Sequence, residues 1–334
     1  TPPPEIYTLS LHDALPICIA PLLAAAKTPE DRALAEQVTV SILASQSLDA
    51  VLAKMDDADV TVRRLAMKAL GDALKGSAPP PKAVTVLQTR LQDPDLGVRR
   101  AAVYALARLP DDKVAASLLK LARDPDAELR EAAVVAATRL TTPEAEKVLL
   151  GGLEDESDKV KAAALDAVAS RRMVAARESL ALLCSYLDTS VRRKAVQAWV
   201  ALLQPGEAAA NYNFLSSLLY DKDPEIKIAI LRIVITIPER KALVAVSSLA
   251  IDPDPQVKLA VIDALSKTRE KDAMEGVQKA VFDGDPAIRM AALDGLQRLG
   301  RPEAIDFLNE LINLESDAAI KAKAASVRDA LLGR

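Results

Sequence analysis

The sequence predicts an all-α fold: an α-solenoid of about ten stacked two-helix repeats. Two observations carry this prediction. A motif recurs at a period near 31 residues along the chain, and the composition is half hydrophobic yet only 3% aromatic. A fixed period of this length is typical of units that cannot bury their apolar faces alone. Stacked helices rich in Ala and Leu need few aromatic residues in their core.

The motif is best seen in Asp252–Lys267, DPDPQVKLAVIDALSK, where an acidic turn leads into an Ala-rich amphipathic helix. We align the repeats on an aliphatic residue, the anchor, which is followed at once by a base. The anchors are Val62, Val98, Leu129, Val160, Val191, Ile226, Val257, Ile288 and Ile320. The two longest intervals contain turn-rich insertions, Lys75–Lys82 and Gln204–Asn213. Two helices of about a dozen residues and two tight turns fill such a period.

The second helix of each repeat, helix B, has a clear start signal three residues before the anchor. An aspartate stands there in eight repeats and Ser157 in the fourth. The aspartates are Asp59, Asp95, Asp126, Asp188, Asp223, Asp254, Asp285 and Asp317. Both residue types accept hydrogen bonds from the free amides of a first helical turn, so we expect N-caps. Pro224, Pro255 and Pro286 follow directly, at the position where a missing N–H costs nothing.

A base follows the anchor in all nine repeats, although a cation in the first turn opposes the helix dipole. These bases are Arg63, Arg99, Arg130, Lys161, Arg192, Lys227, Lys258, Arg289 and Lys321. An acid stands five residues before the anchor in every repeat but the fifth, which has Tyr186. These acids are Asp57, Asp93, Asp124, Asp155, Asp221, Asp252, Asp283 and Glu315. We predict a ladder in which each base pairs with acids of its own or the neighbouring turn. The alternative is solvated charge, because surface pairs contribute little.

The first helix of each repeat, helix A, is expected where an amphipathic segment precedes the acidic turn. The expected ranges are Leu48–Met55, Lys82–Gln92, Asp112–Arg123, Pro143–Glu154, Val174–Leu187, Glu207–Tyr220, Glu239–Ile251, Glu270–Phe282 and Pro302–Leu314. Seven residues past the anchor the side chain is mostly small, which lets neighbouring helices approach closely. Eight residues past it the side chain is mostly apolar until Arg328, as expected of a terminal capping repeat. Gly151 and Gly152 are expected to mark a local helix irregularity.

The first seventeen residues do not follow the repeat pattern. Their segment EIYTLSLHDALPI resembles a translated sequencing adaptor of the kind that contaminates metagenomic reading frames. We therefore expect residues 1–17 to be a non-native leader and residues 18–334 to be an N-terminally truncated solenoid. The leader would carry His12, the one histidine of the chain. An incomplete first repeat is expected at Cys18–Ala26 and Glu30–Ser45, with Leu34 near its anchor.

The motif Asp-Pro-Asp-x-x-Val-Arg followed by Ala-Ala-x-x-Ala-Leu resembles HEAT repeats, in the short form known from bacterial phycobilisome lyase-like proteins. The resemblance covers Cys18–Arg334. It implies an armadillo-like solenoid whose B helices line the concave side, and a role in protein assembly. It also implies an alternative, a lyase-like subunit that acts on a bilin–protein linkage.

Composition and motifs bear on chemistry and location. The net charge of −4 offers no bulk attraction for phosphate backbones, and no apolar run is long enough for a membrane span. With His12 set aside, the chain offers no Ser-His or Cys-His nucleophile and no metal-binding motif. We therefore expect no enzymatic activity, no catalytic residue, no metal and no cofactor. Cys184 is expected to be a small core residue, and a reducing cytoplasmic location follows from cysteine usage.

The candidate partner-binding residues lie two and six residues past the anchors, because residues four apart share one face of a helix. In the early repeats this register, with Arg108 one turn on, gives a basic group: Arg64, Lys68, Arg100, Tyr104 and Arg108. In the later repeats it gives Ile228, Arg232, Leu259, Asp263, Met290 and Asp294. Ile228, Leu259 and Met290, the apolar strip, either form a docking site or pack against the next helix. The basic group is either a binding site or a solvated face. Trp199 is expected in the core, whereas Tyr104 is the better binding candidate.

We therefore predict a monomeric, non-enzymatic scaffold that binds a protein or peptide along its concave face. Two alternatives stay open. One is the bilin lyase-like subunit. The other is a nucleic-acid-binding protein like the HEAT-like DNA glycosylases, which the net charge and the sparse aromatic residues argue against.

Overall fold

The computed structural model describes residues 19, 21–74, 80–109, 114–268 and 270–333. The leader expected at residues 1–17, with His12, lies outside the described residues. Within them the chain is all α-helical, with short 3₁₀ turns and no strand. It divides into two compact units, Thr1–Leu180 and Ala181–Arg334.

The first unit holds an incomplete repeat and four full ones. Residues 21–25 are helical, within the segment expected to begin the incomplete repeat. The helices that follow are α2 (Pro29–Ala44), α3 (Leu48–Lys54), α4 (Val60–Ala73), α5 (Pro81–Arg90), α6 (Leu96–Leu106), α7 (Val114–Leu121), α8 (Ala127–Ala137), α9 (Pro143–Leu153) and α10 (Asp158–Arg171). The 3₁₀ turn η1 (Val174–Ala176) leads into α11 (Arg177–Leu183), whose residues fall on both sides of the unit boundary.

The second unit continues the alternation of A and B helices. Its helices are α12 (Thr189–Ala201), α13 (Glu207–Ala210), α14 (Tyr212–Leu218), α15 (Pro224–Val234), α16 (Arg240–Ser248), η2 (Leu249–Ile251), α17 (Pro255–Ser266), α18 (Ala273–Ala280), α19 (Pro286–Leu299), α20 (Ala304–Leu314) and α21 (Ala318–Leu331). The prediction of a single helix over 207–220 is wrong, because the helix is interrupted at Asn211. The Asn211 side chain donates to the Glu207 carbonyl at 2.8 Å, a local bond that competes with helix continuation.

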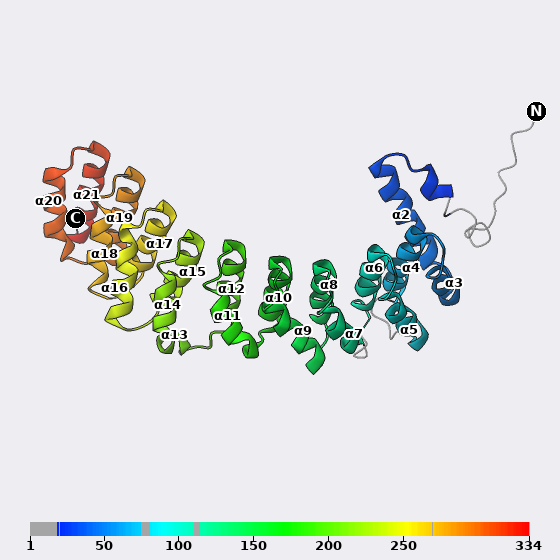
Figure 1. The fold of residues 1–334 in the computed structure, drawn as a ribbon. Helices are drawn as coiled ribbons and strands as arrows, with labels where there is room; N and C mark the ends of the chain where they lie inside the picture. Colours follow the sequence, from blue (N-terminus) through cyan, green and yellow to red (C-terminus); the bar gives the residue numbers. More distant parts are fainter. Residues whose placement is uncertain (1–18, 20, 75–79, 110–113, 269, 334) are drawn as a thin grey trace, which may run out of the picture. The chain divides into compact units, whose positions relative to one another are not determined.

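In each unit the helices stack in chain order, and repeats contact their sequence neighbours (Figure 1). In the first unit the B helices α2, α4, α6, α8 and α10 pack side by side. In the second the row is α12, α15, α17, α19 and α21. The A helices form the other layer; α7 packs on α9, and α16 packs on α18. This nearest-neighbour stacking confirms the predicted solenoid.

The predicted caps of the B helices are confirmed. All eight aspartates are N-caps whose side chains accept from backbone amides of the first turn. Ser157 caps α10 without a side-chain hydrogen bond. All nine anchors are buried between the two layers. Leu34 is 62% exposed, so the anchor expected there is wrong; α2 buries Ala35, Thr39, Val40 and Leu43 instead.

The irregularity expected at Gly151 and Gly152 is also wrong, because α9 runs through both residues. At position 152 neighbouring side chains leave no room for a Cβ atom. A Cβ there would lie 2.9 Å from both the Ala164 Cβ and the Val134 Cγ2. A Cβ at Gly151 would have no atom within 4 Å. The B helices α8 and α10 therefore approach α9 at Gly152.

The predicted ladder forms at six joints, where each base pairs with the turn acid of the next repeat. These pairs are Arg63–Asp93 at 3.1 Å, Arg130–Asp155 at 2.8 Å, Arg192–Asp221 at 2.8 Å, Lys227–Asp252 at 2.6 Å, Lys258–Asp283 at 2.6 Å and Arg289–Glu315 at 3.7 Å. The side chains are mostly buried; those of Arg130 and Asp155 are 8% and 9% exposed. Pairs this shielded are screened far less by solvent than surface pairs.

The ladder arginines make a second set of contacts, to carbonyl oxygens of their own turns. Arg130 Nη1 donates to the carbonyl oxygens of Asp124 and Pro125 in its own turn, at 2.9 and 3.1 Å. Arg63, Arg99, Arg192 and Arg289 bond their own turns in the same way. These bonds account for a cation at a helix start, because it pairs with carbonyl oxygens that precede the helix.

The turn acid also accepts a hydrogen bond from a backbone amide of its own turn. One oxygen of Asp155 accepts from the Ser157 amide at 2.8 Å while the carboxylate receives Arg130. Burial by itself raises the pKa of Asp155, but the Arg130 and Ser157 hydrogen bonds outweigh it, and the pKa lies below its ordinary value. The same balance lowers the pKa of Asp93. Hydrogen bonds from Lys258 and the Asp285 amide lower that of Asp283.

We expect Arg130→Ala to lower the free energy of unfolding by about 3 kcal/mol, because it leaves a shielded carboxylate and two turn carbonyls without their donor. Arg130→Lys keeps a cation for Asp155 and should cost about 1 kcal/mol. Urea unfolding followed by circular dichroism measures both. The control is Lys82→Ala, which breaks the exposed Lys82–Asp49 pair and should cost less than about 1 kcal/mol. Equal losses in Arg130→Ala and Lys82→Ala would contradict the role of the ladder.

Two neighbouring glycines should respond to alanine in opposite directions. Gly152→Ala should destabilise the fold by about 1–3 kcal/mol, because the new methyl group overlaps two helices. Gly151→Ala should stabilise it by about 0.5–1 kcal/mol, since it restricts the unfolded chain and meets no neighbour. Thermal unfolding of the two variants gives the comparison, and the same sign in both would refute the account of Gly152.

Acid should weaken the fold through the ladder carboxylates. The pKa of Asp155 is lower in the folded chain than its ordinary value of 3.8, so the unfolded state binds the proton more readily. The stabilisation is complete above pH 3.8 and is lost as the pH falls through the lower folded-state pKa. Urea midpoints across this range measure the loss. Asp155→Asn should show a shallower pH dependence than the wild type, and an unchanged slope would show that Asp155 plays no part.

Candidate partner-binding surfaces

The structure brings the whole early basic group together in one groove. The groove lies between the B helices α4 and α6 of the first unit and encloses about 470 Å³. Its lining includes Arg64, Lys68, Arg100, Tyr104 and Arg108. These residues come from two successive repeats, and the shared register places them on one face. We call this site the α4–α6 groove.

Small residues make the floor of the α4–α6 groove. Gly71 on α4 and Ala101 and Ala105 on α6 lie between the longer side chains. A Cβ on Gly71 would lie 3.2 Å from the Ala105 Cα, so α4 and α6 are in close contact at this point. The depth of the groove follows from a glycine and alanine floor between arginine walls.

The three arginines that line the groove are each paired with an acid. Arg64 contacts Glu36 of α2 at 2.5 Å, and Arg108 contacts Asp72. Arg100 contacts Glu128 and, at 3.8 Å, Asp126. Each pair uses only some of the five N–H donors of a guanidinium, so further acceptors can bind. The arginine side chains are 32–41% exposed. They are therefore held in place and still reach solvent.

Lys68 and Tyr104 are the accessible members of the groove. Lys68 is exposed and forms no ion pair with the residues that the structure describes. Tyr104 is 53% exposed. An uncompensated ammonium beside an aromatic ring above an apolar floor favours a ligand with both a negative charge and an apolar group.

The later candidates lie on the B helices of the second unit. Ile228 on α15, Leu259 on α17 and Met290 on α19 are all half-buried. The apolar strip is thus neither fully accessible nor sealed in the core. Its use as a docking site stays a prediction.

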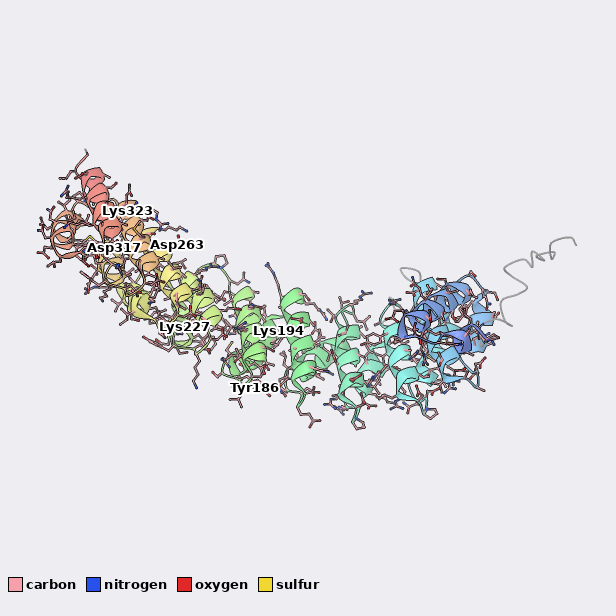
Figure 2. All side chains as sticks on the ribbon, turned by 90° about the horizontal axis from the view of Figure 1, so that it is seen from above. Tyr186, Lys194, Lys227, Asp263, Asp317 and Lys323 are labelled. Atoms are coloured by element: carbon pink, nitrogen blue, oxygen red, sulfur yellow. The ribbon has the colours of Figure 1, made fainter. Side chains whose placement is uncertain are left out.

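Charged residues flank the apolar strip. Arg232 and Asp294 are exposed, and Asp263 is half-buried. Asp263 contacts Lys267 at 2.7 Å and Arg298 at 3.2 Å, and the Lys267 hydrogen bond is the main reason that the pKa of Asp263 lies below its ordinary value. Asp294 contacts Lys323 of α21 at 2.5 Å; Figure 2 labels Asp263 and Lys323 on this unit. The acids of this face are largely compensated.

The two residues expected in the core are there. Trp199 is 4% exposed and packs on Phe214 with 4.6 Å between ring centroids. Cys184 is buried, and the loss of hydration raises the pKa of its thiol to about 12. A thiol with this pKa is protonated at neutral pH and is a poor nucleophile.

The described part of the chain holds no cluster of three or more His, Cys, Asp or Glu side chains arranged to bind a metal ion. None of its helices combines the length and the apolar character that a membrane span requires.

Sequence reasoning missed Glu36, which closes one wall of the α4–α6 groove from the incomplete repeat. It also missed a row of exposed apolar residues at the ends of the A helices in the second unit. These residues share one register of the repeat, which lies on the A helices and not on the B helices.

The chain was compared with solved structures, curated proteins and models of protein families. An engineered protein of known structure is 19% identical, with 95% of this chain and 98% of that chain covered and a TM-score of 0.48. The Escherichia coli protein YibA is 14% identical, with 88% and 96% covered and a TM-score of 0.37. At these TM-scores neither likeness carries an argument about function. A comparison with curated proteins finds no match. The model of HEAT repeats matches residues 48–138, 116–200 and 246–327, which make up more than half of the chain. The chain belongs to the HEAT-repeat family.

Proposed function

We propose that the chain is a non-enzymatic scaffold whose B-helix face binds a partner protein, and that the α4–α6 groove receives an acidic segment of that partner. HEAT repeats indicate an interaction scaffold in general. The observation that carries the specific proposal is the convergence of Arg64, Lys68, Arg100, Tyr104 and Arg108 on one groove.

Charge and shape together define the segment. Acids pair with all three arginines of the groove, and Lys68 is the cation that forms no ion pair with the residues that the structure describes. The floor of Gly71, Ala101 and Ala105 offers no hydrogen-bonding side chain. A peptide that alternates carboxylate and aliphatic side chains therefore satisfies both features.

The same charges favour a peptide over a nucleic acid. The acids paired with the arginines, Glu36, Asp72, Asp126 and Glu128, would repel a continuous row of phosphates. Tyr104 is the one aromatic residue that lines the groove, whereas single-stranded nucleic acids are bound by several stacking rings.

A fluorescent peptide of alternating Glu and Leu should bind the wild-type chain with an affinity that falls as salt is added. Lys68→Glu should weaken binding on the order of tenfold, since it replaces the free cation with a repelling charge. Tyr104→Ala should weaken it less. Fluorescence anisotropy measures each affinity.

The matched control is Arg232→Glu, the same charge change at the same register in the second unit. It should leave peptide binding unchanged. The proposal for the groove fails if Lys68→Glu and Arg232→Glu have equal effects. It also fails if a Ser-for-Leu peptide binds as well, or if single-stranded DNA binds more tightly than the peptide.

A further inference from the structure

One position at the end of each helix A is exposed along the chain: the residue directly before the turn acid of the ladder. Four repeats of the first unit carry a polar or charged residue there, as an exposed position favours. These residues are Asp56, Gln92, Arg123 and Glu154, and all four are exposed.

The second unit places large apolar residues at the same position in four successive repeats. They are Tyr220, Ile251, Phe282 and Leu314, which are 69%, 74%, 65% and 79% exposed. We call these four residues the edge row. The core does not require them, because the equivalent residues of the first unit are polar in the same local fold. Exposed apolar side chains gathered in this way mark interaction sites.

Neighbouring A helices that carry the edge row are in contact. The A helices α14 and α16 pack together, as do α16 and α18. Phe282 then meets Phe307 of α20 edge to face, with 5.8 Å between ring centroids. At a helix spacing near 10 Å, the row is about 30 Å long.

The size of the edge row suits an interface between two small surfaces. Four side chains of this size expose roughly 500 Å² of apolar surface in one chain. Two such rows in contact would bury about 1,000 Å² between them, which is the lower bound for a specific protein interface. Flanking side chains would add to this area.

The charges at the two ends of the edge row are opposite. Lys222 follows Tyr220 by two residues, and Glu310 precedes Leu314 by one helical turn. Both are exposed, and neither forms an ion pair with any residue in the described ranges. Beside the middle of the row stand Ser248 and the mutually paired Lys279 and Glu275. The row is therefore self-complementary when a second copy lies antiparallel to it.

We propose that the edge row is the interface of a homodimer, in which the second units of two copies pack antiparallel about a two-fold axis. Tyr220 of each copy lies against Leu314 of the other, and Ile251 lies against Phe282. Lys222 of each copy then faces Glu310 of the other, which gives two ion pairs at the rim. A two-fold interface uses the same patch on both copies, and the edge row meets this condition.

The dimer differs from the expected monomer and is independent of the function proposed for the α4–α6 groove. The edge row lies on the A helices of the second unit, whereas the groove lies on the B helices of the first. Loss of one interaction therefore leaves the other measurable.

The first test is the mass of the full chain by multi-angle light scattering over a concentration series. The wild type should approach the mass of two chains. Ile251→Gln/Phe282→Arg, which installs the residue types of Gln92 and Arg123, should have the mass of one chain. Its circular dichroism spectrum should match that of the wild type, because both positions are exposed, and loss of the Phe282–Phe307 contact should lower the thermal midpoint only slightly. Gln92→Ala/Arg123→Ala, at the same position in the first unit, should remain a dimer.

The second test exchanges the rim charges. Lys222→Glu and Glu310→Lys should each weaken dimerisation on the order of tenfold, and the double variant should restore it, since the ion pair re-forms with reversed polarity. A wild type that has the mass of one chain at all concentrations would overturn the proposal. So would a dimer that persists in Ile251→Gln/Phe282→Arg, or sedimentation of monomeric wild type with phosphatidylcholine vesicles, which would assign the row to a membrane surface.

Discussion

The structure depends on one shared interaction at the joints between repeats: the turn acid that receives a base from the preceding repeat. Asp155 accepts the Ser157 amide of its own turn and the Arg130 guanidinium of the repeat before it. Arg130 in turn holds the carbonyl oxygens of Asp124 and Pro125. One pair thus fixes two turns and the register between two helix pairs. A nonpolar contact would permit sliding, whereas a bidentate pair has a single geometry. The joint therefore specifies how repeats stack, while apolar burial supplies the driving force.

Repetition explains why the sequence predicted most of the fold. A single Asp before a helix is a weak signal, but the same Asp at one register in eight repeats predicted the caps. The ladder was predictable because a base at a helix start conflicts with the local dipole and requires a partner. The errors fall where the pattern is thin. Leu34 was assigned to the incomplete repeat, whose helix is capped by Thr28 and has Glu30 and Asp31 inside its first turn. The helix break at Asn211 depends on one local side-chain bond. The tight approach at Gly152 involves Ala164 and Val134 on two other helices, whose distances the sequence does not contain.

The candidate site shows a similar division. Register alone placed Arg64, Lys68, Arg100, Tyr104 and Arg108 on one face, and the structure joins them in one groove. Register did not reveal that Glu36, Asp72 and Glu128 compensate three of the four cations. Counting bases along the chain therefore overstated the charge of the site. The feature that sequence reasoning missed altogether, the edge row, required knowledge of exposure. An apolar residue at the end of an amphipathic helix is ordinarily assigned to the core, and only the structure shows that Ile251 and Phe282 face solvent.

The residue directly before the turn acid is polar or charged in four repeats of the first unit and apolar in four repeats of the second. This difference helps to distinguish residues that the fold requires from residues that a function requires. Ladder, cap and anchor residues recur in both units, because they hold the joints between repeats. The residue before the turn acid is exposed in both units but differs in kind: it is Gln92 or Glu154 in one unit and Ile251 or Phe282 in the other. An exposed position that becomes apolar in four successive repeats needs a cause outside the fold, because exposed apolar surface favours association and opposes solubility. In a repeat protein, equivalent positions of successive repeats can be compared directly. Where several successive repeats depart from the common residue type in the same way, the departure indicates a surface that contacts another molecule.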